Sequence, residues 1–292
     1  MTKILCLFFI GIVVLLLLSP NVLHLQSKAD EVISVSNVLG RTIRLDVLCD
    51  DFEDTNWSYN PQTEKFYKKL WRGGSGRGVP KLLKRITPPY GGKNGSLGAL
   101  EIATRVETYK DNDPEQDDLL TAEYEQILGR KLTRADQPVF IVHVWLPPLD
   151  QWSDVCNFGF RHESFPKNGN KYYPTIWMYY NKQVEQKPFF VFRIGTGPTR
   201  DVRGVSIDQF GWWTLAIAFD KGGIGHYYAS PGVNNPTEKN EVFDTTRFRS
   251  PNGTDNPSMD YINYSFFSLT CPTNGNTSPR FVIDDYEVWV VK

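Results

Sequence analysis

The hydrophobic pattern of this chain alternates with a period of two, most clearly between Phe210 and Val233. Apolar side chains recur at every second position from Trp213 to Phe219, as in a β-strand with one buried face. Residues 220–223 (DKGG) tolerate the positive φ of a tight hairpin, and Pro231 with Gly232 ends the returning strand. The stretch therefore predicts a β-hairpin in the middle of a sheet.

The register of this hairpin decides which face His226 occupies, because a slip of one residue turns every side chain to the other face. We expect His226 to lie opposite Ala216. Tyr228 would then lie opposite Thr214, so that small side chains leave room for large ones. An unpaired imidazole is costly to bury, which favours this register, with His226 facing outward, over the slipped one.

The same alternation continues through much of the chain. In the strand expected at 139–146, His143 and Trp145 lie on the face opposite the apolar side chains. One helix is expected at 114–129, with Asp117 and Asp118 near its start and Gly129 as its cap. Further strands are expected at 100–106, 157–162, 172–180, 189–194, 261–269 and 280–291.

Many short strands separated by turn residues, without a repeated alternation of helices and strands, are typical of an antiparallel sandwich. The sequence therefore predicts an all-β fold, an antiparallel two-sheet jelly roll with one short helical insertion. A hydrophobic fraction of 40% and an aromatic fraction of 14% are enough for a large core. The sandwich domain is expected at 47–292, after an N-terminal extension at 30–46.

The N-terminus predicts export. Lys3 precedes an apolar run from Ile4 to Leu18, and residues 27–29 (SKA) offer small residues at the spacing of a cleavage site. Residues 1–29 are therefore interpreted as a signal peptide or, alternatively, as an uncleaved N-terminal anchor. The protein is expected to be secreted, periplasmic or in the cell envelope, with membrane contact only through an uncleaved N-terminal segment.

The charge of the chain bears on nucleic-acid binding, and its cysteines bear on disulfide formation. The net charge is −1, with 32 basic and 33 acidic residues, so there is no basic excess for a nucleic-acid partner. Export permits disulfides. Three cysteines follow the leader, and Cys49 with Cys271 is the favoured pair, which leaves Cys156 without a partner in the chain. The pairing stays open at this point.

Two motifs near the ends of the predicted sandwich carry a family resemblance. DDFED (50–54) and VIDDYEVWV (282–290) resemble the first and last strands of concanavalin A-like jelly rolls, and the central hairpin resembles that of laminin-G-like modules. This superfamily includes legume-lectin-like modules, laminarinase-type glycoside hydrolases and polysaccharide lyases. The chain also looks like uncharacterised secreted bacterial proteins of this type.

The resemblance bears on metal and on mechanism. It implies a structural Ca²⁺ at the meeting of the first and last strands, with Asp285 and Glu53 as ligands, although calcium takes six to eight oxygens. The E-x-D-x-x-E motif of the laminarinase-like enzymes is absent from the sequence. A polysaccharide lyase is therefore favoured over a glycoside hydrolase, if the protein is an enzyme.

Residues on the outward faces of the predicted strands form the expected ligand surface, on the concave sheet. Aromatic faces stack on sugar rings and arginine binds carboxylates in a bidentate manner, so together they predict binding of a polysaccharide or glycoconjugate, an acidic glycan included. The expected ligand-binding residues are His143, Trp145, Arg161, Trp177, Tyr179, Arg193, Trp212, His226 and Tyr228.

Two alternatives remain open for the same residues. In a lyase, Arg193 or Arg161 would neutralise a uronic acid carboxylate, while His226 or Tyr228 would take the C5 proton and return it to the leaving oxygen in a β-elimination. In the other alternative these are ordinary strand residues, and the domain is a structural or adhesion protein of the envelope with no small ligand.

Overall fold

The structure is a computed structural model, and the expected leader lies outside the residues that it describes. Within the described part of the chain, no helix has the length and apolar character needed to cross a membrane. The described residues are 42–292 except 61, 64, 75–77, 105–115, 153–156, 168–169, 182–185, 195–200, 237–239, 245–257 and 272–276.

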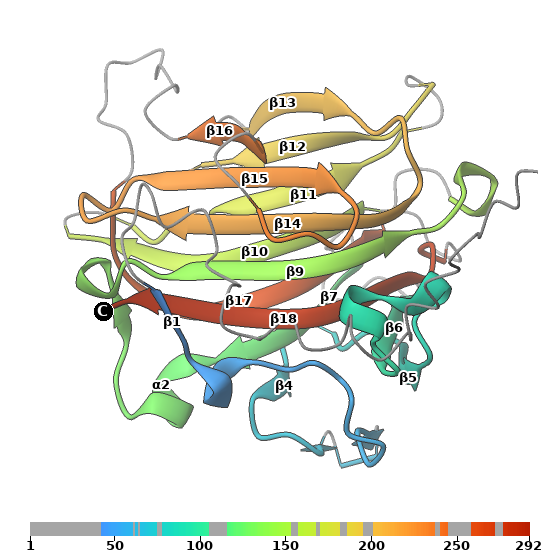
Figure 1. Ribbon diagram of the computed structural model, residues 1–292, viewed down its shortest axis with the longest axis horizontal. Helices are drawn as coiled ribbons and strands as arrows, with labels where there is room; N and C mark the ends of the chain where they lie inside the picture. The colour runs from blue at the N-terminus through green and yellow to red at the C-terminus, as the bar shows by residue number, and fades with distance from the viewer. Residues whose placement is uncertain are drawn as a thin grey trace, which may run out of the picture. The chain divides into compact units, whose positions relative to one another are not determined.

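Two large antiparallel sheets make up the described part, which confirms the predicted all-β sandwich (Figure 1). We call them sheet A and sheet B. The order of strands in sheet A is β16 (Glu241–Asp244), β15 (Gly225–Pro231), β14 (Gly211–Phe219), β9 (Val139–Leu146), β18 (Phe281–Val291), β6 (Ala99–Ala103) and β5 (Leu82–Ile86), with β1 (Thr42–Arg44) beside β18.

Sheet B is built from the remaining long strands. Because the chain crosses repeatedly between the sheets, neighbours within a sheet are often distant in sequence, as in a jelly roll. The order in sheet B is β13 (Asp201–Ser206), β12 (Phe189–Arg193), β11 (Thr175–Tyr179), β10 (Asn157–Pro166), β17 (Met259–Cys271), β7 (Gln116–Glu123) and β4 (Trp71–Gly73), with β8 (Leu132–Thr133) beside β17.

Short elements fill the connections. β2 (Tyr59–Asn60) and β3 (Lys65–Phe66) pair with each other, and α2 (Tyr124–Leu128) follows β7 directly. The 3-10 turns are η2 (Asp46–Leu48), η3 (Pro89–Gly91), η4 (Lys93–Gly95), η5 (Arg134–Asp136) and η6 (Leu149–Gln151).

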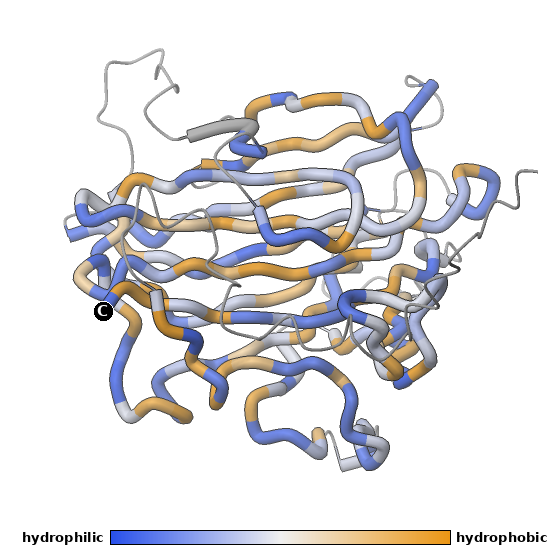
Figure 2. Tube along the Cα trace, viewed as in Figure 1, coloured by the Kyte–Doolittle hydropathy of each residue, from blue (hydrophilic) through white to orange (hydrophobic). Residues whose placement is uncertain are grey.

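Aromatic side chains from both sheets meet in the core. Phe267 lies 5.7 Å from Phe160 and 5.9 Å from Phe158 by ring centroids, and Tyr286 of the opposite sheet lies 5.9 Å from it. Each of these four rings is almost fully removed from water, and burial of an aromatic side chain contributes on the order of 1.5–3 kcal/mol. Figure 2 shows apolar residues recurring along the strands of both sheets.

A line of polar groups crosses this core. The Nδ1 atom of His162 is hydrogen-bonded to the hydroxyl of Ser265, Tyr124 bonds the same hydroxyl, and Tyr124 also meets the hydroxyl of Tyr286 at 2.7 Å. Burial lowers the pKa of His162 to about 3, because water is not there to solvate an imidazolium. These partners let the core hold polar groups that would be costly to bury alone.

The central hairpin forms as expected, but its predicted register is wrong by two residues. Phe219 pairs with Gly225, Ala218 with His226, and Ala216 with Tyr228. The turn is longer than expected because the side chain of Asp220 accepts a hydrogen bond from the Ile224 N–H, at 2.9 Å. A shift of two residues preserves the faces of a strand, so His226 stays on the outward face.

The helix predicted at 114–129 is wrong over most of its length. Residues from Gln116 to Glu123 form β7, and only Tyr124–Leu128 is helical. The apolar residues Leu120 and Tyr124 lie four positions apart, and residues four apart share a face in a strand as well as in a helix. Pairing with β17 along the whole of β7 decides for the strand.

The expected Cys49–Cys271 disulfide is also wrong. Cys49 is a free thiol, whereas Cys271 is disulfide-bonded. The Cys49 thiol donates a hydrogen bond to the carbonyl of Leu45 at 3.2 Å and accepts one from the Val288 N–H at 3.3 Å. Burial raises the pKa of this thiol to about 11. Cys156 lies outside the described residues.

The segment before β2 joins the two sheets through the buried side chain of Asp50. One carboxylate oxygen accepts hydrogen bonds from the indole N–H groups of Trp57, at 3.0 Å, and Trp71, at 2.6 Å. The other accepts from the ammonium of Lys68 at 2.5 Å and from the Phe52 N–H at 3.0 Å. Trp71 opens β4 of sheet B, so this carboxylate anchors that strand.

The backbone of Asp50 completes the connection. Its N–H donates to the carbonyl of Tyr286 at 2.9 Å, and its own carbonyl accepts from the Tyr286 N–H at 2.9 Å. Tyr286 belongs to β18 of sheet A. Asp50 therefore binds sheet A with its main chain and sheet B with its side chain.

We expect Asp50→Ala to lower the free energy of unfolding by about 3–5 kcal/mol, because it leaves two buried indole donors and an ammonium without their acceptor. Asp51→Ala, one residue along the chain and exposed, should cost only about 0.5 kcal/mol. Urea unfolding followed by tryptophan fluorescence measures both. Equal losses in the two variants would contradict this role for Asp50.

Candidate functional site

The nine expected ligand-binding residues are divided between the two sheets. Local alternation identifies the outward face of each strand correctly, but the strands belong to different layers. His143, Trp145, Trp212, His226 and Tyr228 lie on sheet A, and Arg161, Trp177, Tyr179 and Arg193 lie on sheet B.

The outer face of sheet A is largely covered. His143 is fully buried there and its Nδ1 atom lies 2.8 Å from the hydroxyl of Thr214. Burial lowers the pKa of His143 to about 3. Trp145 and Trp212 meet edge to face at 5.7 Å, and the exposed ring of Tyr90 stacks on Trp145 at 5.1 Å.

The lyase residues are not brought together. His226 lies between two carboxylates of sheet A, with its Nδ1 3.4 Å from Glu241 and its Nε2 3.7 Å from Asp220. Tyr228, two positions along β15, is buried on the same face. Arg193 projects from the outer face of sheet B, on the other layer. These three side chains therefore share no surface.

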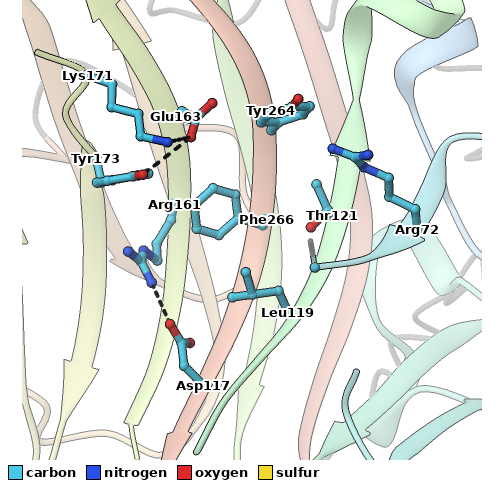
Figure 3. Close-up of a pocket in the computed structure, with 11 residues that line it drawn as sticks. Arg72, Asp117, Leu119, Thr121, Arg161, Glu163, Lys171, Tyr173, Tyr264 and Phe266 are labelled. Atoms are coloured by element: carbon cyan, nitrogen blue, oxygen red, sulfur yellow. Dashed lines mark hydrogen bonds and ion pairs between the residues drawn. The ribbon is translucent and has the colours of Figure 1, made fainter. Parts of the chain in front are cut away.

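A groove of about 400 Å³ lies on the outer face of sheet B (Figure 3). Its floor comes from β7, β10 and β17, which run side by side, and one wall comes from the segment before β11. The lining residues are Arg72, Gly74, Asp117, Leu119, Thr121, Arg161, Glu163, Lys171, Tyr173, Tyr264 and Phe266.

Arg161 lies at the centre of this groove. Its guanidinium is within 4.9 to 5.4 Å of the ring centres of Phe266, Trp177 and Tyr173, where cation–π attraction favours it. It also forms an ion pair with Asp117 at 3.4 Å (Figure 3). The two charged side chains are only 11% and 14% exposed, so the pair is held in place by its surroundings.

A second polar cluster lies along the wall of the groove. The Glu163 carboxylate accepts hydrogen bonds from the Lys171 ammonium at 3.0 Å and from the Tyr173 hydroxyl at 3.3 Å (Figure 3). The bonds to Glu163 and Tyr173 raise the pKa of Lys171. Lys171 is therefore a cation and a hydrogen-bond donor at neutral pH, rather than a base.

Two further arginines pair with carboxylates on the same face of sheet B. Arg72 of β4, which lines the groove, is 3.1 Å from Glu123 and lies over the ring of Tyr264 at 4.7 Å. Arg193, which lies outside the groove lining, holds Asp201 in a bidentate pair at 2.7 and 2.8 Å.

Arg193 also lies 5.6 Å from the ring centre of Trp177, so Trp177 is bordered by two arginines. The ring of Tyr179 contacts Phe189 at 5.3 Å on the same outer face.

Sequence reasoning found Arg161 in this groove and missed most of its neighbours. Glu163 could have been found, because it lies two positions from Arg161 on a strand and so shares its face. Asp117 falls in the predicted helix. Lys171 precedes the strand predicted at 172–180, and Tyr173 falls within that prediction although the observed strand begins at Thr175. Arg72 lies in a stretch for which no strand is predicted, before the strand expected at 100–106.

The carboxylates named for calcium do not form a ligand cluster. Glu53 accepts hydrogen bonds from the Leu97 and Gly98 N–H groups, at 2.7 and 3.2 Å. No group of three or more His, Cys, Asp or Glu side chains among residues 42–292, gaps excepted, is placed to hold a metal ion. Calcium at Glu53 and Asp285 would therefore depend on backbone and water oxygens, and we derive no function from it.

Asp285 is instead notable for its charge environment. It adopts a left-handed φ of 46°. Burial, with the neighbouring Asp284 as a second cause, raises the pKa of Asp285 to about 7. Burial also raises the pKa of Asp284 to about 6. Folding therefore moves the titration of both carboxyls towards neutral pH.

Comparison with known proteins yields similarity of architecture only. No model of a known protein family matches the sequence, and no curated protein matches it. A protein of unknown function from Shewanella oneidensis MR-1 has a TM-score of 0.48 and 9% identity, with 83% of this chain and 84% of that one covered.

Two further solved structures are similar at the same low level. The CBM2 module of an evolved Dit protein from Lactobacillus casei BL23 phage J-1 has a TM-score of 0.47 and 10% identity over 86% of this chain and 97% of that one. An alginate lyase from Pseudomonas aeruginosa has a TM-score of 0.43 and 10% identity over 72% and 85%. At these values the likeness does not reach the side chains of a site.

We expect Asp285→Asn to stabilise the protein more at pH 8 than at pH 5. The raised pKa means that wild-type Asp285 contributes stability while it is protonated and loses this contribution as the pH rises through about 7. Asparagine stays neutral at both pH values and tolerates the left-handed backbone. Melting temperatures at the two pH values measure the effect, and an equal gain at both would contradict it.

The same experiment tests the calcium hypothesis. If an ion bound at Glu53 and Asp285, added Ca²⁺ would raise the melting temperature of the wild type by mass action. Asp285→Asn would then remove that response instead of stabilising the protein.

Proposed function

We propose that the groove on sheet B binds a polysaccharide. The observation that carries this proposal is the arrangement around Arg161, where a fixed guanidinium lies among three aromatic rings, two of which, Tyr173 and Phe266, line the groove. Aromatic rings pack against the apolar face of a sugar, and planar charged groups hydrogen-bond its hydroxyls. A long, regular sheet face suits a chain of repeating sugar units.

Binding fits the groove better than elimination does. A lyase needs a group that can accept a proton beside the residue that neutralises the uronic acid. The histidines that the structure describes lie elsewhere: His143 and His226 on sheet A, and His162 in the core. Lys171, the amine in the groove, has a raised pKa and stays protonated, and the Glu163 carboxylate already accepts hydrogen bonds from Lys171 and Tyr173.

We expect Arg161→Ala to abolish retention on polysaccharides that the wild-type protein binds, with a loss of about tenfold or more, as for hot-spot side chains worth at least ~1.4 kcal/mol. Affinity electrophoresis in gels containing individual polysaccharides measures this. Arg130→Ala removes an exposed arginine paired with Asp136 outside the groove, and it should bind like the wild type.

Two outcomes would contradict the groove. If His226→Ala lost binding and Arg161→Ala did not, the ligand surface would be on sheet A. If an unsaturated, ultraviolet-absorbing product accumulated, the protein would be a lyase rather than a binding module. Failure to bind any polysaccharide would favour the structural or adhesion role.

We also propose that this function is exercised outside the cytoplasm. The basic start at Lys3 and the apolar run at 4–18 support export. The exported protein is expected to begin near Asp30, and N-terminal sequencing after secretion from a suitable host checks this. A membrane-bound protein that retains Met1 would favour the uncleaved anchor.

A further inference from the structure

We propose that the groove selects an uncharged polysaccharide and rejects a polyuronate. The inference rests on the proposed function and names the substrate class of the same groove. The arginines alone suggested an acidic glycan as the ligand. A cation attracts an acidic ligand less strongly, however, when a carboxylate of the protein already neutralises its charge.

Each cation among the described residues that line the groove, and also Arg193 beside it, is paired with a carboxylate. Four basic side chains face four acidic ones, so their formal charges cancel. The pairs are Arg72 with Glu123 at 3.1 Å, Arg161 with Asp117 at 3.4 Å, Lys171 with Glu163 at 3.0 Å, and Arg193 with Asp201 at 2.7 Å.

The central pair cannot be opened easily to receive a sugar carboxylate. The Arg161 guanidinium is enclosed by the rings of Phe266, Trp177 and Tyr173 and also donates to the Ser268 hydroxyl at 3.2 Å. Asp117 in turn accepts a hydrogen bond from Ser268. A ligand carboxylate would have to displace Asp117 from this network.

A uronic acid would also meet carboxylates on both sides of Arg161. Glu163 lies two positions along the same strand, and its side chain is 12% exposed. Asp117 borders Arg161 on the other side (Figure 3). These two carboxylates therefore offset the attraction that Arg161 and Lys171 would otherwise exert on an acidic ligand.

Sugar hydroxyls carry no charge, and each can both donate and accept a hydrogen bond. Lys171, with three N–H donors, lies beside the acceptor Glu163, and the donor Arg161 lies beside the acceptor Asp117. Neighbouring hydroxyls on one ring can therefore meet a donor and an acceptor together. The groove is matched to an uncharged polyol.

The experiment uses two polymers that differ only at C6: a soluble β-1,4-glucan and the polyglucuronate obtained by oxidising its C6 hydroxymethyl groups. The full-length protein should be retained by the glucan, or by another neutral polymer of a panel, and its retention should change little with salt. It should not be retained by the oxidised form of that same polymer.

The carboxylates are then removed one at a time with isosteric changes. Asp117→Asn and Glu163→Gln each remove the negative charge that faces one groove cation, so each should gain binding to the polyuronate, by about tenfold, and that binding should weaken with added salt. Asp208→Asn is the matched control, because Asp208 pairs with Lys187 on the surface outside the groove. Thermal melts establish that each variant is folded.

The outcomes separate the two proposals. Tighter binding of the polyuronate than of the neutral polymer by the wild type would overturn the charge selection and leave polysaccharide binding intact. Binding of the polyuronate that does not increase in either variant would also overturn the charge selection. If no neutral or acidic polymer is retained, the proposed function itself is wrong, and this inference fails with it.

Discussion

The burial of one carboxylate, that of Asp50, holds the two sheets of this sandwich at one edge. A buried carboxylate is costly unless its charge and its lone pairs are met, and here two indoles, an ammonium and a backbone N–H meet them. Because Trp71 is one of these donors, β4 is anchored against β7. Arg72 follows Trp71 directly, so the end of the groove depends on the same interaction.

The groove itself is a consequence of regular pairing between strands distant in sequence. β10 pairs with β17, and β17 pairs with β7, over nearly their whole lengths. Their outward residues therefore form rows, in which Arg161 and Glu163 lie beside Phe266 and Tyr264. The inward residues of the same strands supply the aromatic core, including Phe160 and Phe267.

The two outer faces of the sandwich differ in how far their polar side chains are exposed to water. On sheet A, burial removes His143 from water and leaves it neutral. On sheet B, charged side chains remain partly exposed and are matched in opposite pairs. A ligand whose groups hydrogen-bond to water can form hydrogen bonds with these partly exposed charged pairs instead. The buried imidazole of His143 could bind a ligand only if the residues that cover it moved away.

The sequence by itself determined most of the long strands and which of their side chains share a face. The alternation around β9 and β14 identified their inward and outward residues, because a strand's period of two depends only on neighbouring residues. What only the tertiary structure decided was the layer to which each strand belongs. Trp145 and Arg161 both face outward, but they do so on opposite sides of the molecule.

The same limit explains the individual errors. Residues four apart share a face in helices and strands alike, so β7 was told from a helix only by its partner β17. The hairpin register depended on the hydrogen bond to the side chain of Asp220. Whether Cys49 is a free thiol depended on its neighbours in the fold, such as Val288, which lie far away in the sequence. The pairing of each groove cation was likewise out of reach, because ion pairs such as Arg161 with Asp117 join residues on separate strands, and only folding brings them together.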